Sequence, residues 1–117
     1  MHSPKAVIIV AGGSGLRMNS DVPKQFLELH GKPILMHTIE KFYIFDSSIT
    51  IVVVLPSAHV SYWQKCCVQH QFVIKHQLAI GGKTRFDSVL SGLKLVSNAK
   101  FIAVHDAVRP LVSVAII

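Results

Sequence analysis

The stretch AVIIVAGGSGLRM, residues 6–18, passes from an apolar run directly into a glycine-rich loop. An uninterrupted apolar run is typical of a parallel strand that is buried on both faces. Glycines at the end of such a strand let backbone N–H groups approach an anion closely, because no Cβ atom lies in the way. Arg17 adds a planar cation to the loop, and Lys24 follows further along the chain. The stretch therefore predicts a phosphate or nucleotide site at the end of the first strand.

Two well-known phosphate-binding motifs do not fit this loop. A P-loop requires Gly, four residues and then Gly-Lys-Ser/Thr, a string that does not occur in the sequence. The dinucleotide fingerprint G-x-G-x-x-G would begin at Gly13 but has Met18 in its last position. It also requires an acidic residue after the second strand, where this chain has Pro56. Taken alone, the loop leaves two interpretations open: a phosphate site, or a strand-to-helix turn without a ligand.

Length and composition limit the number of domains and the environment of the protein. A chain of 117 residues that is 50% hydrophobic can form one packed domain. Its longest apolar stretches have the length of strands, so we expect no membrane-spanning segment. Cys66 and Cys67 are neighbours in a predicted helix, without the spacing of a metal site or a structural disulfide. We therefore expect a reducing, cytoplasmic environment.

The charge distribution argues against nucleic acid as a partner. The formal net charge is +6, from 12 Lys and Arg against 6 Asp and Glu. The basic residues form no run of three and do not alternate with aromatic residues, as a nucleic-acid surface would require. The arginines, Arg17, Arg85 and Arg109, each follow a predicted strand. This placement favours a small ligand that carries several phosphates.

Hydrophobic periodicity predicts an alternation of strands and helices. We expect strands at 6–11, 49–55, 72–80 and 101–104, and helices at 34–45, 57–69 and 85–96. Ser57 is a candidate cap for the second helix, and Thr84 with Asp87 resembles a capping box for the third. The alternation predicts an α/β fold, a Rossmann-like parallel sheet with helices on both faces. Ligands of such sheets bind outside the carboxyl ends of the strands, where Arg17, Arg85, Asp106 and Arg109 fall.

Four motifs, in order along the chain, give a specific resemblance. They are AGGSGLRM at 11–18, PKQF at 23–26, Gly81-Gly82 with Arg85 and Ser88, and HDAVRP at 105–110. Together they resemble the cytidylyltransferases of the nucleotide-diphospho-sugar transferase fold, and most closely the 2-C-methyl-D-erythritol 4-phosphate cytidylyltransferase family. The ribitol-5-phosphate cytidylyltransferases share nearly all of these motifs and stay an alternative.

The resemblance implies a role for each motif residue. Arg17 and Lys24 are the expected catalytic residues at the α-phosphate of CTP, and Arg109 with Asp106 is expected to bind the sugar phosphate. Asp106 is also the expected ligand of Mg²⁺. The expected contacts to CTP come from Ala11, Gly12, Gly13, Ser14, Gly15, Gly82, Arg85, Ser88 and Asp106.

The resemblance also implies a larger protein. We expect residues 1–117 to be the N-terminal, CTP-binding part of a single nucleotidyltransferase domain, and the remainder to make a homodimer. The expected reaction, part of non-mevalonate isoprenoid biosynthesis, joins CTP and 2-C-methyl-D-erythritol 4-phosphate into 4-diphosphocytidyl-2-C-methyl-D-erythritol and pyrophosphate. Neither nucleic acid nor a membrane is an expected partner. A non-catalytic nucleotide-binding module is the alternative from another class.

Overall fold

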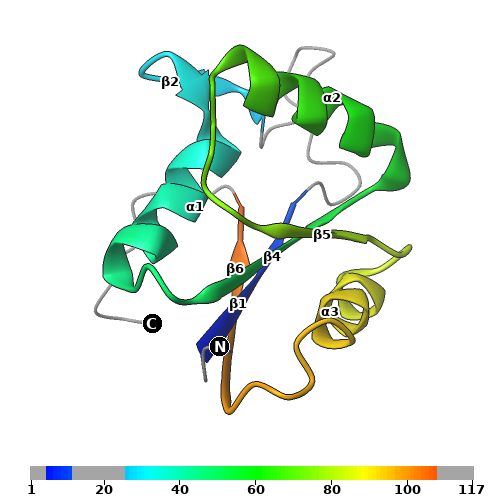
Figure 1. Ribbon diagram of the computed structural model, residues 1–117. Coiled ribbons are helices and arrows are strands. Elements are labelled where there is room, and N and C mark those ends of the chain that lie inside the picture. Colours follow the sequence, from blue (N-terminus) through cyan, green and yellow to red (C-terminus); the bar gives the residue numbers. More distant parts are fainter. Residues whose placement is uncertain (1–4, 12–25, 108–117) are drawn as a thin grey trace.

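A parallel sheet of four strands forms the centre of the computed structural model, which describes residues 5–11 and 26–107 (Figure 1). The strands lie in the order β5-β4-β1-β6 and all neighbours are parallel. Their bounds are β1 Lys5–Val10, β4 Thr50–Leu55, β5 Gln77–Ile80 and β6 Phe101–Asp106. The two central strands, β1 and β4, are the most apolar and the most buried, as expected for strands with helices on both faces.

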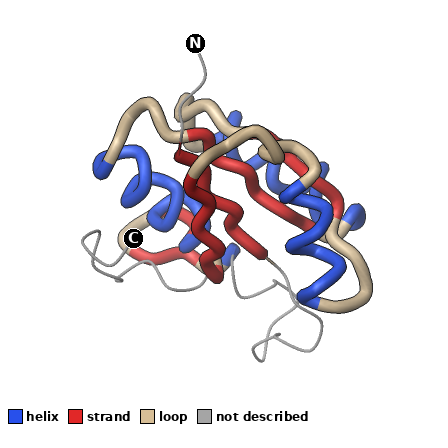
Figure 2. Tube along the Cα trace, turned by 90° about the horizontal axis from the view of Figure 1, so that it is seen from below, coloured by secondary structure: helices blue, strands red, loops and turns tan. Residues whose placement is uncertain are grey.

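Three helices cover the two faces of this sheet (Figures 1 and 2). Helices α1, Ile34–Phe45, and α2, Ser57–Gln69, lie on one face, and α3, Arg85–Leu93, lies on the other. Because neighbouring strand residues point to opposite faces, Val7 and Ile9 pack in the core below α1 and α2, whereas Ile8 packs in the core on the α3 side. The predicted α/β fold class is confirmed.

The strand order reverses direction at β1. The chain passes from β1 to β4 and then β5 on one side, and returns through α3 to place β6 on the other side of β1. In open parallel sheets such a reversal leaves a crevice at the carboxyl ends of the two strands involved, and ligands bind there. The topology therefore points to the ends of β1 and β6.

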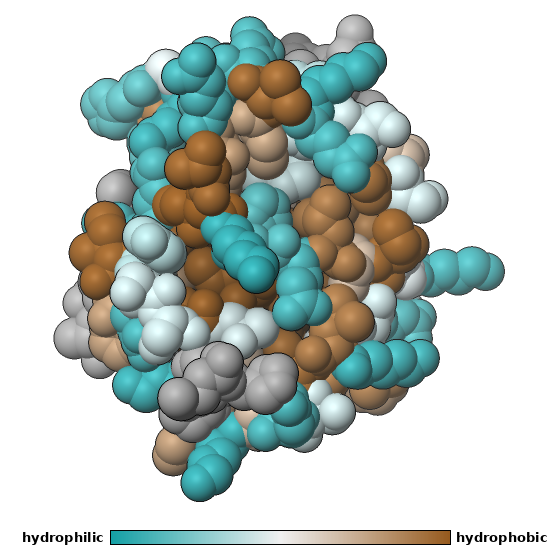
Figure 3. All heavy atoms as spheres, viewed as in Figure 1, coloured by the Kyte–Doolittle hydropathy of each residue, from teal (hydrophilic) through white to brown (hydrophobic). Residues whose placement is uncertain are grey.

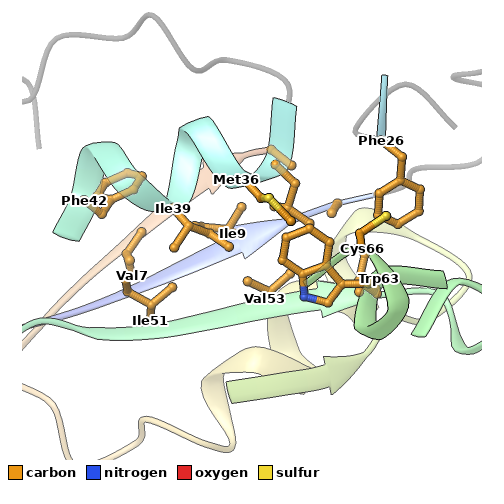
Figure 4. Close-up of a cluster of buried hydrophobic side chains, with 14 of the residues drawn as sticks. Val7, Ile9, Phe26, Met36, Ile39, Phe42, Ile51, Val53, Trp63 and Cys66 are labelled. Carbon is orange, nitrogen blue, oxygen red and sulfur yellow. The ribbon is translucent and has the colours of Figure 1, made fainter. Parts of the chain in front are cut away.

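The larger of the two cores lies between the sheet and the α1–α2 layer (Figure 4). Trp63 of α2 is fully buried in it. Its indole Nε1–H donates to Nε2 of His76 over 3.0 Å, and the other ring nitrogen of His76 lies 2.8 Å from the carbonyl of Ile74. The neutral tautomer that carries its proton on Nδ1 satisfies both contacts.

A short antiparallel hairpin was not predicted. Strands β2, Glu28–Leu29, and β3, Lys32–Pro33, are joined by His30 and Gly31. Both joining residues have positive φ, 54° and 84°, which suits the tight turn of a two-residue hairpin loop. Strands of two residues are too short to show a hydrophobic period.

Three local predictions were wrong. The strand expected at 72–80 is present only at Gln77–Ile80: pairing with β4 begins at Gln77, and before it the carbonyl of Ile74 contacts Nδ1 of the His76 ring. The helix expected at 85–96 ends at Leu93, where the backbone tightens into i→i−3 hydrogen bonds from Leu95 and Val96. Ser57 does not cap α2: Pro56 holds the cap position, without a side-chain hydrogen bond.

The residues of α3 that are most deeply buried against the sheet are small. Ser88 and Gly92 are the buried positions of the helix, whereas Phe86 and Leu90 are 70% and 41% exposed. A Cβ atom on Gly92 would lie 2.6 Å from Cγ2 of Ile8, so the glycine allows the helix to approach the sheet closely. Figure 3, drawn in the same orientation as Figure 1, shows hydrophobic side chains at the molecular surface between hydrophilic ones.

Candidate functional site

The strand order reverses between β1 and β6, and this position is called the switch point. The strand ends around it are held in place by backbone hydrogen bonds. In each case the residue directly after a strand donates its N–H to the carbonyl of a neighbouring strand. The bonds are Ala11 to Val54 at 2.9 Å, Gly81 to Leu55 at 2.7 Å and Ala107 to Val10 at 3.0 Å. Each loop on this edge therefore starts from a fixed position.

Arg85 and Asp106 meet at this edge. Asp106 is the last residue of β6 and Arg85 the first of α3, and Nε of Arg85 lies 3.5 Å from Oδ1 of Asp106. The arginine stands at the positive end of the α3 dipole, an unfavourable place that the carboxylate offsets. Their side chains are 59% and 37% exposed, so the pair adds little to stability. Both charged groups are thus accessible to an anionic or metal-bound ligand.

The turn that connects β5 to α3 is held by the first turns of that helix. The Gly82 N–H donates to Oγ of Ser88 over 3.2 Å, and Thr84 Oγ1 accepts from the Asp87 N–H over 3.1 Å. The predicted capping role of Thr84 is thereby confirmed. A Cβ atom on Gly82 would lie 2.3 Å from Cβ of Asp87, so a larger residue would displace the turn. These bonds fix Gly82, Arg85 and Ser88 as one unit.

The sequence-predicted site residues divide into two groups. Ala11, Gly82, Arg85, Ser88 and Asp106 are described, and the structure places all of them on or beside the carboxyl edge of the sheet. The others lie outside the described residues: Gly12, Gly13, Ser14, Gly15, Arg17, Lys24 and Arg109.

Thr38 is a residue of this region that sequence reasoning missed. It lies in the middle of α1 and is fully buried, and its Oγ1 donates to the carbonyl of Ala107 over 2.6 Å. The sequence does contain a signal for it, because Thr38 is a polar residue between Leu35 and Phe42 on the apolar face of the helix. Ala107 is therefore held at both its N–H and its carbonyl.

Other reactive side chains of the described chain do not join the site. His105 points away from Asp106, as expected for neighbours on a strand, and its ring packs edge-on against Phe42 at 5.1 Å. Cys66 and Cys67 are free thiols in α2. Burial raises the pKa of both, that of Cys67 to about 11, which leaves little thiolate for nucleophilic attack near neutral pH.

The described residues contain no group of three or more His, Cys, Asp or Glu side chains that could hold a metal ion. One carboxylate beside a phosphate site is nevertheless a common arrangement for Mg²⁺, which keeps several waters and takes its other ligands from the phosphates. Asp106, partly exposed at the switch point, fits that role. Within the same residues, no helix has the length and apolar character needed to cross a membrane.

The fold and the edge residues define a Rossmann-like α/β domain with an arginine–aspartate pair at its switch point, where domains of this class bind their ligands. A sequence profile of the 2-C-methyl-D-erythritol 4-phosphate cytidylyltransferases matches residues 5–117. The chain belongs to this family.

Individual relatives agree with this assignment. The chain is 55% identical to the 2-C-methyl-D-erythritol 4-phosphate cytidylyltransferase of Phocaeicola vulgatus over 107 residues, and 56% identical to that of Azobacteroides pseudotrichonymphae over 108. Each match covers 92% of this chain and 49% of the relative. The chain thus spans about half the length of these curated relatives.

Solved structures with a similar fold also come from this family. The bifunctional IspDF from Campylobacter jejuni has a TM-score of 0.78 and 31% identity, over 97% of this chain and 28% of that one. The 4-diphosphocytidyl-2C-methyl-D-erythritol synthase from Anaerococcus prevotii has a TM-score of 0.73 and 25% identity, over 96% and 47%.

Proposed function

We propose that the full-length protein transfers the cytidylyl group of CTP to 2-C-methyl-D-erythritol 4-phosphate, releasing pyrophosphate. The observation that carries the proposal is the pairing of Arg85 with Asp106 at the switch point of a chain that matches this family along residues 5–117. The relatives' names supply the substrates.

The described residues suit the nucleotide in different ways. The N–H of Ala11 is already bonded to Val54, so we assign its contact with CTP to its carbonyl oxygen. Gly82 and Ser88 are held in one fixed turn, which we assign to the cytidine side of the nucleotide, and Arg85 brings a positive charge beside them. The glycine loop 12–15, with Ser14, is proposed to hold the triphosphate through backbone N–H groups.

The chemistry requires alignment more than proton transfer. An oxygen of the acceptor's 4-phosphate attacks the α-phosphorus of CTP, a new P–O bond forms, and the bond to the β-phosphate oxygen breaks. The nucleophile is already an anion, so no general base is needed. We propose that Arg17 and Lys24 stabilise negative charge around the α-phosphorus, while Arg109 and Asp106 bind the acceptor.

A divalent cation fits the same edge. We propose that Asp106 holds Mg²⁺ together with phosphate oxygens, and that Arg85 keeps this carboxylate oriented. When bound, the ion supplies charge neutralisation at the phosphates.

Two free thiols in one helix suit a reducing compartment. We therefore place the protein in the cytoplasm.

We further propose a homodimer, formed through the part that corresponds to the second half of the relatives, with no nucleic-acid or membrane partner. Light scattering of the full-length protein tests the dimer.

A pyrophosphate-release assay on the full-length protein tests the function. CTP is offered with methylerythritol phosphate and, in parallel, with ribitol 5-phosphate; ATP, GTP and UTP replace CTP in further reactions. We expect turnover with CTP and methylerythritol phosphate to exceed every other pair. Faster turnover with ribitol 5-phosphate would assign the sister activity, and binding of CTP without release under any condition would indicate a non-catalytic nucleotide-binding module.

A further inference from the structure

Thr38 is a polar residue on the buried, apolar side of α1, where a hydroxyl group is unexpected. Thr38 and Ser88 are the buried polar residues of the described chain, and Thr38 is fully buried. It shares the sheet-facing side of α1 with Leu35, Ile39 and Phe42, where an apolar residue of the same shape would pack equally well. A buried hydroxyl is costly unless it is hydrogen-bonded.

The hydrogen bond that Thr38 makes joins two layers of the fold. Its Oγ1 lies 2.6 Å from the carbonyl of Ala107 and 3.3 Å from that of Ile34, one turn earlier in the helix. A hydroxyl has a single proton, and the shorter contact to Ala107 takes it. The bond therefore links α1, through a separation of 69 residues, to the end of β6.

The bond holds the carboxyl end of an edge strand. Among the described strands β6 lies at the edge of the sheet and pairs only with β1. Phe101 and Val104 are 66% and 40% exposed, whereas Ala107, directly after the strand, is buried in the larger core. The Ala107 N–H is bonded to Val10 and its carbonyl to Thr38, which fixes the residue next to Asp106 at both polar groups.

From this geometry we propose that Thr38 is a positioning residue for the catalytic edge. Through Ala107 it holds the strand end that carries Asp106, and so keeps the carboxylate within reach of Arg85. The part of this inference that concerns turnover rests on the proposed function. Thr38 itself touches neither substrate.

The test compares three variants of the full-length protein. Thr38→Val keeps the shape and removes the hydroxyl, Thr38→Ser keeps the hydroxyl, and Thr50→Val makes the same change at the opposite end of the sheet, where β4 begins. We expect Thr38→Val to lower kcat about 10- to 100-fold at a temperature where it is folded, as for a misplaced reacting group. Thr38→Ser should stay within about threefold of the parent, and Thr50→Val should be unchanged.

A second readout does not depend on activity. Hydrogen exchange of the Ala107 amide, followed in the same variants, should accelerate in Thr38→Val, while amides in the middle of β4 keep their rates. Normal kcat in Thr38→Val, or an equal loss of kcat in Thr50→Val, would overturn the proposal. A parent protein that exchanges normally but turns nothing over would contradict the proposed function instead, and the exchange rates would still decide whether Thr38 holds the strand end.

Discussion

At the scale of single residues, the charged pair at the carboxyl edge of the sheet joins two elements that are distant in sequence. Arg85 and Asp106 meet because a helix begins and a strand ends at the same edge. The sequence could predict this meeting, since the carboxyl ends of parallel strands share one edge. It could not predict the Thr38–Ala107 bond, because a threonine inside a helix has no pattern that names its partner 69 residues away.

The cations of the first loop are expected to act on the transition state. In the full-length protein, Arg17→Ala or Lys24→Ala should each lower kcat on the order of 10²–10³-fold, by analogy with removal of one oxyanion donor. Arg17→Lys should restore activity only in part, because an ammonium group lacks the planar fork of the guanidinium. Steady-state kinetics measures these losses, and melting temperatures should hardly change.

A suitable comparison for these variants is Lys65→Ala, which removes an exposed lysine of α2. It should leave both kcat and the melting temperature unchanged. Normal turnover in Arg17→Ala and Lys24→Ala would contradict the proposed roles and would leave the loop as a simple strand-to-helix turn.

At the scale of elements, the sequence predicted which segments form helices and strands better than how they pack. Phe86, Val89, Leu90 and Leu93 have helical spacing and correctly indicated α3. The large residues Phe86 and Leu90 are nevertheless exposed. The most buried residues of the helix are Ser88 and Gly92, and Leu93 is partly buried beside them. Periodicity reports apolar residues, whereas close helix–sheet contact depends on small ones.

Gly92→Ala tests this packing. The new Cβ would lie 2.6 Å from Ile8 and 3.2 Å from Val54, both in the core. The clash should cost about 1–3 kcal/mol. Alanine gains roughly 1 kcal/mol over glycine in a helix, so we expect the free energy of unfolding to fall by up to about 2 kcal/mol. Thermal or denaturant unfolding measures it. Ser91→Ala, the neighbouring change, should be neutral or slightly stabilising; equal or higher stability of Gly92→Ala would show that α3 does not depend on the close contact.

The thiols of α2 allow a prediction about pH. Burial raises the pKa of Cys67 from 9.0 to about 11, which stabilises the thiol over the thiolate. A raised pKa means less thiolate at any pH below it, and a higher-pKa thiolate is only in part a better nucleophile. At pH 8 iodoacetamide should therefore label Cys67 at least about tenfold more slowly than a thiol of ordinary pKa. Labelling of a Cys66→Ala variant isolates Cys67. Burial, the larger cause of the raised pKa, remains in this variant, so the rate should keep rising above pH 9.

The same variant unfolded in denaturant provides the reference rate. If the folded protein reacted as fast as the unfolded one, or if its rate levelled off near pH 9, the account of α2 as a helix with protected thiols would be wrong.

For the whole molecule, the sequence was sufficient to predict the fold class and the family. It was not sufficient to predict the short hairpin or the end of α3. Apolar runs identified the buried strands β1 and β4, and the motifs around Gly82, Arg85 and Asp106 identified the family, which the profile match over residues 5–117 confirms. The hairpin at Glu28–Pro33 and the early end of α3 were missed, because turns and caps depend on single residues rather than on a period.

The central claim is that the protein joins the cytidylyl group of CTP to a sugar phosphate at the carboxyl edge of this sheet. Phosphorus NMR of the full-length protein with CTP, methylerythritol phosphate and Mg²⁺ tests it directly. The account predicts two mutually coupled signals from a new diphosphate diester, together with one equivalent of free pyrophosphate. Inorganic phosphate with CDP, CMP without a diester, or an unchanged CTP spectrum would contradict it.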